Sequence, residues 1–139
     1  MATALIRMRI KQGETVAFEA MARALYDQSH HCERALLRYE YWRGQEPGTY
    51  YCLQAFADYA GFLTYETAPY HEAAAAPIMA LIADFDLQWV DPVAGAAPLN
   101  PSLEQLLASG SGDRETFYAG LFPLKRAAWW PATARSEQP

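Results

Sequence analysis

The chain has 139 residues, 52% apolar and 19% charged, so it can bury the core of one globular domain and is not a disordered chain. Its formal net charge is −5 and its basic residues never cluster, which argues against a nucleic-acid partner. No apolar stretch approaches the roughly 20 residues of a membrane span, and Arg7 and Arg9 interrupt the first apolar run, so we expect no membrane partner, no signal peptide and a cytoplasmic location.

The first two elements are predicted from a change of hydrophobic period. In residues 4–11 every second side chain is apolar and most of those between are charged, which indicates a strand with one buried face. Gln12 and Gly13 end this strand, and residues 14–32 then carry apolar side chains at helical spacing, beginning with Phe18. The chain therefore opens with a strand, a turn and an amphipathic helix.

A hairpin is predicted next. Residues 35–43 alternate again and are rich in aromatic side chains, and residues 49–56 form a second run of the same kind. The turn residues 44–48 leave room for only a short connection, so two antiparallel strands are the simplest arrangement.

Two helices and a strand follow the hairpin. Residues 58–67 have helical spacing, with Asp58 as a candidate cap, and Pro69 breaks this helix. Residues 71–82 are rich in alanine, which favours a second helix, and residues 84–90 alternate once more. The order of elements predicts an α+β, ferredoxin-like fold of the form β-α-β-β-α-β, with a four-stranded antiparallel sheet.

We assign this domain to residues 1–91 and treat residues 92–139 as a C-terminal extension with short helices. One helix is expected over residues 100–108, and one or two helical turns over residues 113–118. The apolar residues 117–130 should be docked on the domain or on a partner subunit, because exposing them to water is unfavourable by about 25 cal/mol per Å². There they could also close the mouth of a pocket.

The sheet is expected to have one uncovered face. Helices on one side leave the other side bare, and here it would carry Leu5 and either Leu36 or Leu37 among charged residues. Pairing two such faces would cover them, so we expect a homodimer.

Four short pieces of sequence at the ends of these elements are typical of one family. They are the strand that ends before Gly13, the turn Glu46-Pro47-Gly48, the strand end Phe56-Ala57-Asp58, and His71 near a helix start. In these pieces the chain resembles the antibiotic biosynthesis monooxygenase family of the dimeric α+β-barrel superfamily. For oxygenases of this kind the resemblance implies a small aromatic substrate, O₂, and no cofactor, neither metal nor flavin.

Departures from the family pattern concern the chemistry. Where the family usually has Glu-x-Trp-x-Asp, this chain has Gln54, Phe56 and Asp58. One family histidine is matched by Tyr65 or Glu66, and another by His71. Related haem-degrading enzymes place an asparagine on the first strand where this chain has Ile6, which argues against haem degradation.

The resemblance makes His71 the candidate base, because an imidazole with an ordinary pKa of about 6.5 can take a proton from a phenol or enol. The alternative for His71 is packing or capping at a helix start. Tyr65 is the second candidate catalytic residue, through its hydroxyl. Candidates for substrate binding are Trp42, Tyr51, Phe56, Trp89 and Arg7. The alternatives are core packing for the aromatic residues and a cross-strand ion pair with Asp84 or Asp86 for Arg7.

The favoured function is a cofactor-independent monooxygenase acting on an aromatic polyketide or a quinol-like substrate. The alternatives are a non-catalytic small-molecule binding module, a polyketide cyclase, and a haem-binding or haem-degrading protein. We expect no metal site at His30-His31-Cys32-Glu33, because adjacent helical residues point about 100° apart. Cys32 and Cys52 are expected to be free, buried thiols.

Overall fold

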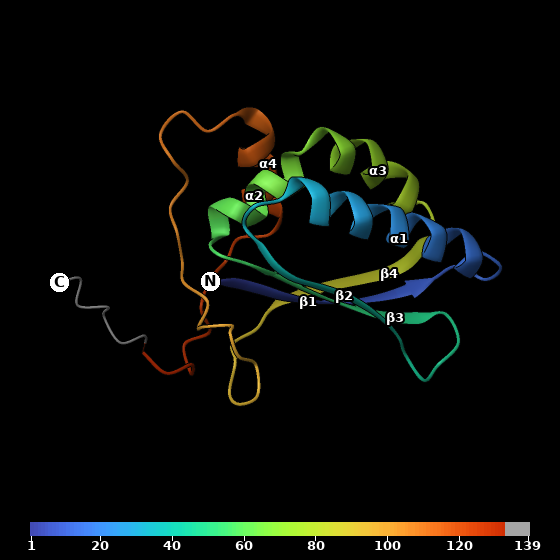
Figure 1. Cartoon of the computed structure of the whole chain (residues 1–139), viewed down its shortest axis with the longest axis horizontal. Helices are drawn as coiled ribbons and strands as arrows, with labels where there is room; N and C mark the ends of the chain where they lie inside the picture. Colours follow the sequence, from blue (N-terminus) through green and yellow to red (C-terminus); the bar gives the residue numbers. More distant parts are fainter. Residues whose placement is uncertain (133–139) are drawn as a thin grey trace.

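The sheet and the helices that cover one of its faces dominate the structure (Figure 1), a computed structural model that describes residues 1–132. In chain order the elements are β1 (Ala2–Ile10), α1 (Thr15–Cys32), β2 (Leu36–Arg43), β3 (Thr49–Phe56), α2 (Tyr59–Thr67), α3 (Pro69–Met79), β4 (Ile82–Trp89) and α4 (Asp113–Leu121). The predicted β-α-β-β-α-β order is confirmed, with α2 and α3 together forming the second crossover.

The strands lie in the order β2-β3-β1-β4, and every neighbouring pair is antiparallel. The central strand β1 pairs with β3 on one side and with β4 on the other. The sheet is open, with β2 and β4 at its edges.

The core lies between the sheet and the helices, as the alternation in β1 predicts. Ile6 and Met8 are buried against the helices, whereas Leu5 and Arg7 point to the opposite face. Phe18 and Leu25 bring the apolar stripe of α1 onto this core. The helical stripe ends at the buried Ser29, so Cys32 at the last position of α1 is exposed; the expectation that Cys32 is buried is wrong, while Cys52 is buried and both thiols are free.

The start of α2 is fixed by a cap and by a close approach. Asp58 Oδ1 accepts a hydrogen bond of 2.7 Å from the backbone N–H of Gly61, which confirms the predicted cap. A Cβ at Gly61 would lie 2.5 Å from the Cβ of Ala35. Glycine therefore lets α2 approach the segment that leads into β2.

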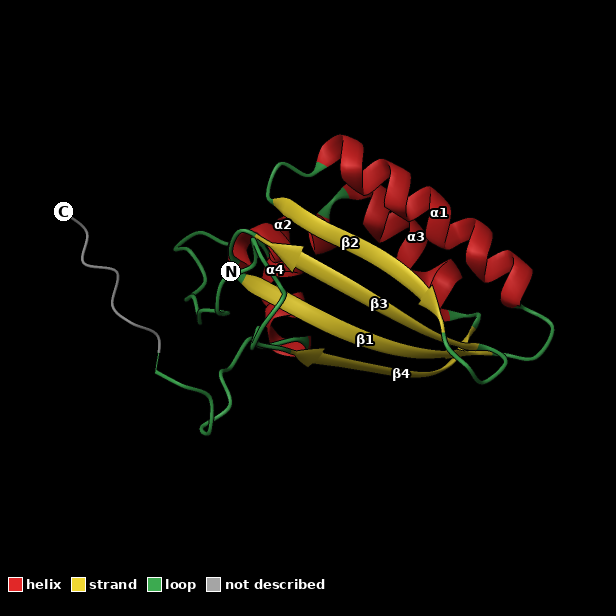
Figure 2. Cartoon of the chain, turned by 60° about the horizontal axis from the view of Figure 1, so that its bottom comes forward, coloured by secondary structure: helices red, strands yellow, loops and turns green. Residues whose placement is uncertain are grey.

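The other face of the sheet is uncovered over most of its area (Figure 2). Four large apolar residues are exposed on or beside it: Leu5, Leu37, Trp42 and Tyr51. Arg7 forms an ion pair of 3.1 Å with Asp84 across β1 and β4, which is the cross-strand pairing expected as its alternative role.

The extension departs from the prediction over residues 100–108, which form no helix. Ser102 Oγ accepts from the N–H of Thr3 and donates to the carbonyl of Val90, while the N–H of Ser102 donates to Asp91. These bonds to the ends of β1 and β4 replace the hydrogen bonds within a helix. Further along, α4 packs against α2 on the helical side of the sheet.

Candidate functional site

A cavity of about 400 Å³ lies between the sheet and the helical layer. Its floor comes from β1, β3 and β4, its roof from α3, and one wall from α4 and the residues that follow it. Apolar side chains make most of the lining, among them Ile6, Met8, Ile78, Phe85, Leu87 and Phe122. A cavity of this size with few polar groups is typical of small-molecule sites.

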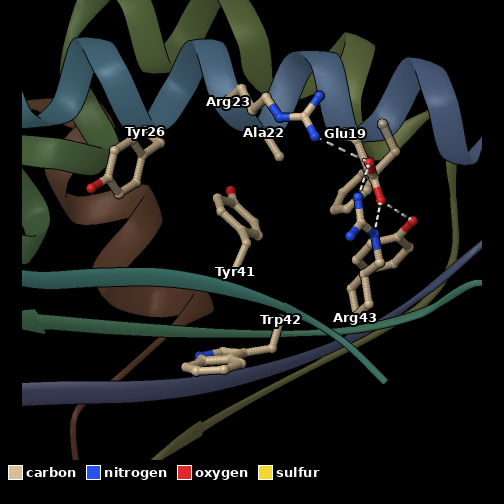
Figure 3. Close-up of a pocket in the computed structure, with 9 residues that line it drawn as sticks. Glu19, Ala22, Arg23, Tyr26, Tyr41, Trp42 and Arg43 are labelled. Atoms are coloured by element: carbon tan, nitrogen blue, oxygen red, sulfur yellow. Dashed lines mark hydrogen bonds and ion pairs between the residues drawn. The ribbon is translucent and has the colours of Figure 1, made fainter. Parts of the chain in front are cut away.

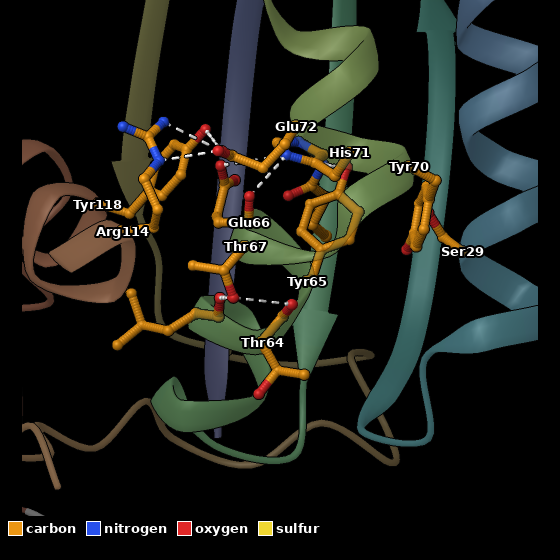
Figure 4. A network of polar contacts seen from close by, with 12 residues as sticks. Ser29, Thr64, Tyr65, Glu66, Thr67, Tyr70, His71, Glu72, Arg114 and Tyr118 are labelled. Carbon is orange, nitrogen blue, oxygen red and sulfur yellow. Dashed lines mark hydrogen bonds and ion pairs between the residues drawn. The ribbon is translucent and has the colours of Figure 1, made fainter. Parts of the chain in front are cut away.

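The junction of α2 and α3 brings polar groups to this cavity (Figure 4). Ala68, between the helices, has an extended backbone, and Pro69 starts the new helix. The chain therefore folds back, and the ring of His71 lies 4.4 Å from the ring of Tyr65, measured between centroids.

The environment of His71 keeps it neutral and fixes its proton. Its Nδ1 lies 3.0 Å from the backbone carbonyl oxygen of Glu66, a group that can only accept, so Nδ1 carries the hydrogen and Nε2 keeps its lone pair. Burial lowers the pKa of His71 below 6.5. At neutral pH the ring can therefore act as a base through Nε2.

The carboxyl of Glu66 faces the same cavity. Its Oε2 is 3.7 Å from His71 Nδ1, which is beyond hydrogen-bond distance. Burial, together with the nearby carboxylate of Glu72, raises the pKa of Glu66 to about 8. Glu66 is therefore a neutral carboxylic acid at pH 7.

A row of tyrosine hydroxyls runs along one side of the cavity. Tyr39 lies 2.8 Å from Tyr41 and 3.1 Å from Tyr65, measured between hydroxyl oxygens, and Gln54 Nε2 donates to Tyr65 at 3.4 Å. Burial raises the pKa of all three tyrosines above its ordinary value. They remain hydroxyls and can donate hydrogen bonds.

Contacts around Glu72 hold α4 against the cavity. Glu72 accepts hydrogen bonds from Arg114 at 2.8 and 3.2 Å and from the hydroxyl of Tyr118. Both partners lower the pKa of Glu72, Arg114 more strongly. Phe117 and Tyr118 thereby form part of the cavity wall.

The structure separates the residues that the sequence grouped into one site. His71 and Tyr65 share the cavity. Trp42, Tyr51 and Arg7 lie on the opposite face of the sheet, because alternate strand residues point to opposite sides and these three are in register with one another.

Phe56 and Trp89 lie near the cavity without lining it. Phe56 is fully buried and packs against Phe62 and Tyr65, and Trp89 packs edge-on against Phe62. Both are core residues at one end of the sheet, which matches the alternative given for them.

A second hollow, of about 440 Å³, lies at the edge of β2 beneath α1 (Figure 3). Glu19 there accepts bonds of 2.6 and 2.9 Å from Arg43 and one of 2.9 Å from Tyr50. The carboxylate of Glu19 is therefore already paired with Arg43 and Tyr50. It is not available as an acid or base in the way that His71 and Glu66 are in the first cavity. We therefore place the candidate site in the first cavity.

Sequence reasoning missed the polar row and undervalued Glu66, which entered only as one of two matches to a family histidine. The signal was present, because Tyr39 and Tyr41 are alternate residues of β2, and both lie opposite inward-facing residues of β3. Within residues 1–132, no group of three His, Cys, Asp or Glu side chains could hold a metal ion. In the same range no helix is long and apolar enough to cross a membrane.

Comparisons with known proteins concern the same part of the chain. A family model described as antibiotic biosynthesis monooxygenase matches residues 1–77. A solved structure of a candidate monooxygenase of this kind from Caulobacter crescentus superposes with a TM-score of 0.63 at 20% identity, over 67% of this chain and 90% of that one. A similar candidate from Bacteroides thetaiotaomicron gives a TM-score of 0.65 at 16% identity, over 71% and 95%. A Mycobacterium tuberculosis protein gives a TM-score of 0.62 at 12% identity, over 69% of this chain and 98% of that one. These identities support the fold alone, and no curated protein matches the chain.

Proposed function

The chain belongs to the antibiotic biosynthesis monooxygenase family, and from this premise we propose that it is a cofactor-independent monooxygenase acting on an aromatic polyketide or a quinol-like substrate. The observation that carries the proposal is a neutral histidine, His71, with a free Nε2 in a mainly apolar cavity. An aromatic substrate fits such walls, and the histidine supplies the base that the reaction needs.

The proposed reaction begins when His71 Nε2 takes a proton from the substrate. The resulting electron-rich anion transfers electrons to O₂ and forms a carbon–oxygen bond. One oxygen atom stays in the product as a carbonyl and the other leaves as water, so that a CH₂ group and O₂ give C=O and H₂O. Tyr65 can stabilise the anion when it accepts from Tyr39 and donates its own proton to the substrate oxygen.

The proposal includes a homodimer and a cytoplasmic enzyme. The exposed Leu5, Trp42 and Tyr51 support pairing through the open sheet face, since such residues are stabilised by removal from water. Two partner sheets would complete the barrel implied by the family. The two free thiols, Cys32 and Cys52, fit a reducing compartment.

Oxygen consumption tests this function. Purified protein is mixed with 1,8-dihydroxyanthrone in buffer that contains a metal chelator, and O₂ uptake is followed with an electrode. We expect uptake above autoxidation that scales with protein concentration, with quinone appearing at the same rate. Uptake equal to that of buffer, or activity only after adding a metal or flavin, would contradict the proposal.

A further inference from the structure

Glu66 carries an unused hydrogen-bonding group inside the cavity. The residue is 6% exposed, and its carboxyl makes no hydrogen bond to any part of the chain between residues 1 and 132. A buried carboxyl without a partner is unfavourable in a folded protein. Residues 1–132 supply no partner for this carboxyl, and a ligand in the cavity could provide one.

Two donors near Glu66, from His71 and Tyr118, are directed elsewhere. His71 Nδ1 binds the backbone carbonyl of Glu66 and not its carboxyl. The hydroxyl of Tyr118 binds Glu72, and the hydroxyl of Tyr65 lies in the row with Tyr39 and makes no hydrogen bond to Glu66. The neighbouring α2, α3 and α4 thus leave this carboxyl open to the cavity, which it lines.

The cavity also lacks a counter-charge for an anion. No lysine or arginine contributes to its lining in the described part of the chain. Arg114, which lies nearby on α4, is held by Glu72. A carboxylate or phosphate entering the cavity would lose its hydration without gaining a cation, which is strongly unfavourable.

From these contacts we propose that Glu66 binds a hydroxyl group of the substrate, and that the substrate is an uncharged, hydroxylated aromatic molecule. The inference rests on the proposed function, because it assigns a partner within the same cavity. It narrows the substrate to compounds without a carboxylate, phosphate or other group that is ionised at pH 7. The substrate hydroxyl bonded to Glu66 lies beside His71, whose ring is next to the same carboxyl. Glu66 thus holds the substrate beside the imidazole ring of His71.

Binding without turnover tests this inference. Three naphthalene probes of one shape are titrated into the full-length protein by calorimetry, at pH 7 and without O₂: 2-naphthol, 2-methylnaphthalene and 2-naphthoate. We expect 2-naphthol to bind roughly tenfold more tightly than 2-methylnaphthalene, which corresponds to one hydrogen bond. The naphthoate should bind least tightly of the three.

Two variants assign the preference to Glu66. Glu66→Met keeps the length of the side chain and should abolish the preference for 2-naphthol over 2-methylnaphthalene. Glu66→Gln retains hydrogen-bonding atoms and should keep the preference. Equal affinities of wild type for these two probes, tight binding of the naphthoate, no binding of any probe, or a preference that survives in Glu66→Met would each overturn the inference.

The comparison within the wild type needs no variant, so a folding defect in Glu66→Met cannot hide a negative result. The outcome is also separate from catalysis. Selective, Glu66-dependent binding without O₂ uptake would contradict the oxygenase function and support the role of Glu66. O₂ uptake without selective binding would support the oxygenase function and contradict the role of Glu66.

Discussion

At the scale of single residues, the cavity combines a base and an acid that are both neutral at pH 7. His71 is neutral because burial lowers its pKa, and Glu66 is neutral because burial raises its pKa to about 8. The two side chains carry no net charge into an apolar space, so the fold tolerates them there. The same neutrality leaves a lone pair on His71 and a proton on Glu66 for chemistry.

Replacement of His71 by alanine should lower kcat/KM by roughly 10²- to 10⁴-fold, the usual contribution of a positioned general base. The fold should remain intact, as judged by circular dichroism. His31→Ala is the matched control, because His31 is an exposed histidine on α1. Unchanged kinetics of His71→Ala on a confirmed substrate would exclude His71 from the mechanism.

Glu66 should make the free energy of unfolding depend on pH. Its pKa is about 8 in the folded protein, whereas the ordinary value for a glutamate, which applies to the unfolded chain, is 4.5. The folded form therefore binds more protons between these values, and the protein loses stability as pH rises from 4.5 to 8. Glu66→Gln lacks this titration. Its free energy of unfolding should therefore exceed that of wild type at pH 9 by up to about 5 kcal/mol, and should equal it near pH 4.

Urea unfolding at pH 4 and pH 9 measures this difference. Glu46→Gln serves as the control, since Glu46 is exposed in the turn between β2 and β3. A Glu66→Gln variant that follows the pH dependence of wild type would show that Glu66 is ionised in the folded protein throughout this range.

At the scale of secondary-structure elements, the approach of α2 to the start of β2 requires glycine at position 61. An alanine there would favour the helix by up to about 1 kcal/mol, but its Cβ would meet the Cβ of Ala35 at 2.5 Å. We expect Gly61→Ala to be destabilised by about 1–3 kcal/mol in urea unfolding. Gly120→Ala in α4 has open space around the new Cβ and should be neutral or slightly stabilised; equal effects of both substitutions would refute the steric argument.

The segment that begins with α4 closes one side of the cavity. A chain that ends at Ser109 loses the buried Tyr118 and Leu124, each worth about 1.5–3 kcal/mol of hydrophobic stabilisation. It should unfold at lower urea concentration and, if α4 excludes water from the reaction, turn over more slowly. A chain that ends at Pro131 is the control. A truncated protein of lower stability and full activity would reduce α4 to a structural role.

At the scale of the whole molecule, the open sheet face predicts self-association. Light scattering should give about twice the protomer mass of 15.6 kDa. Leu5→Glu places a charge on the central strand of that face and should yield monomers. Val16→Glu is the control. Val16 is also apolar and exposed, but it lies on α1 and not on the open sheet face, so this variant should remain a dimer. A wild-type monomer at micromolar concentration would refute the proposed dimer.

The sequence by itself determined the elements and the side of the sheet that each strand residue faces. Alternation in β1 placed Ile6 and Met8 in the core, and Asp58 marked the start of α2. These features depend on neighbours within a few residues, so a local pattern contains them. His71 and Tyr65 were chosen through the family resemblance, and the fold brings them together.

Only the tertiary structure decided which groups remain without partners and which segments meet. Within residues 1–132 the carboxyl of Glu66 has no hydrogen-bond partner, because the donors of His71 and Tyr118, on two other helices, bind other groups. Ser102 joins the ends of β1 and β4 and so prevents the helix expected around it; its contact with Thr3 spans 99 residues of sequence. Such contacts arise when distant parts of the chain compete for the same hydrogen bonds, and no local pattern records the outcome of that competition.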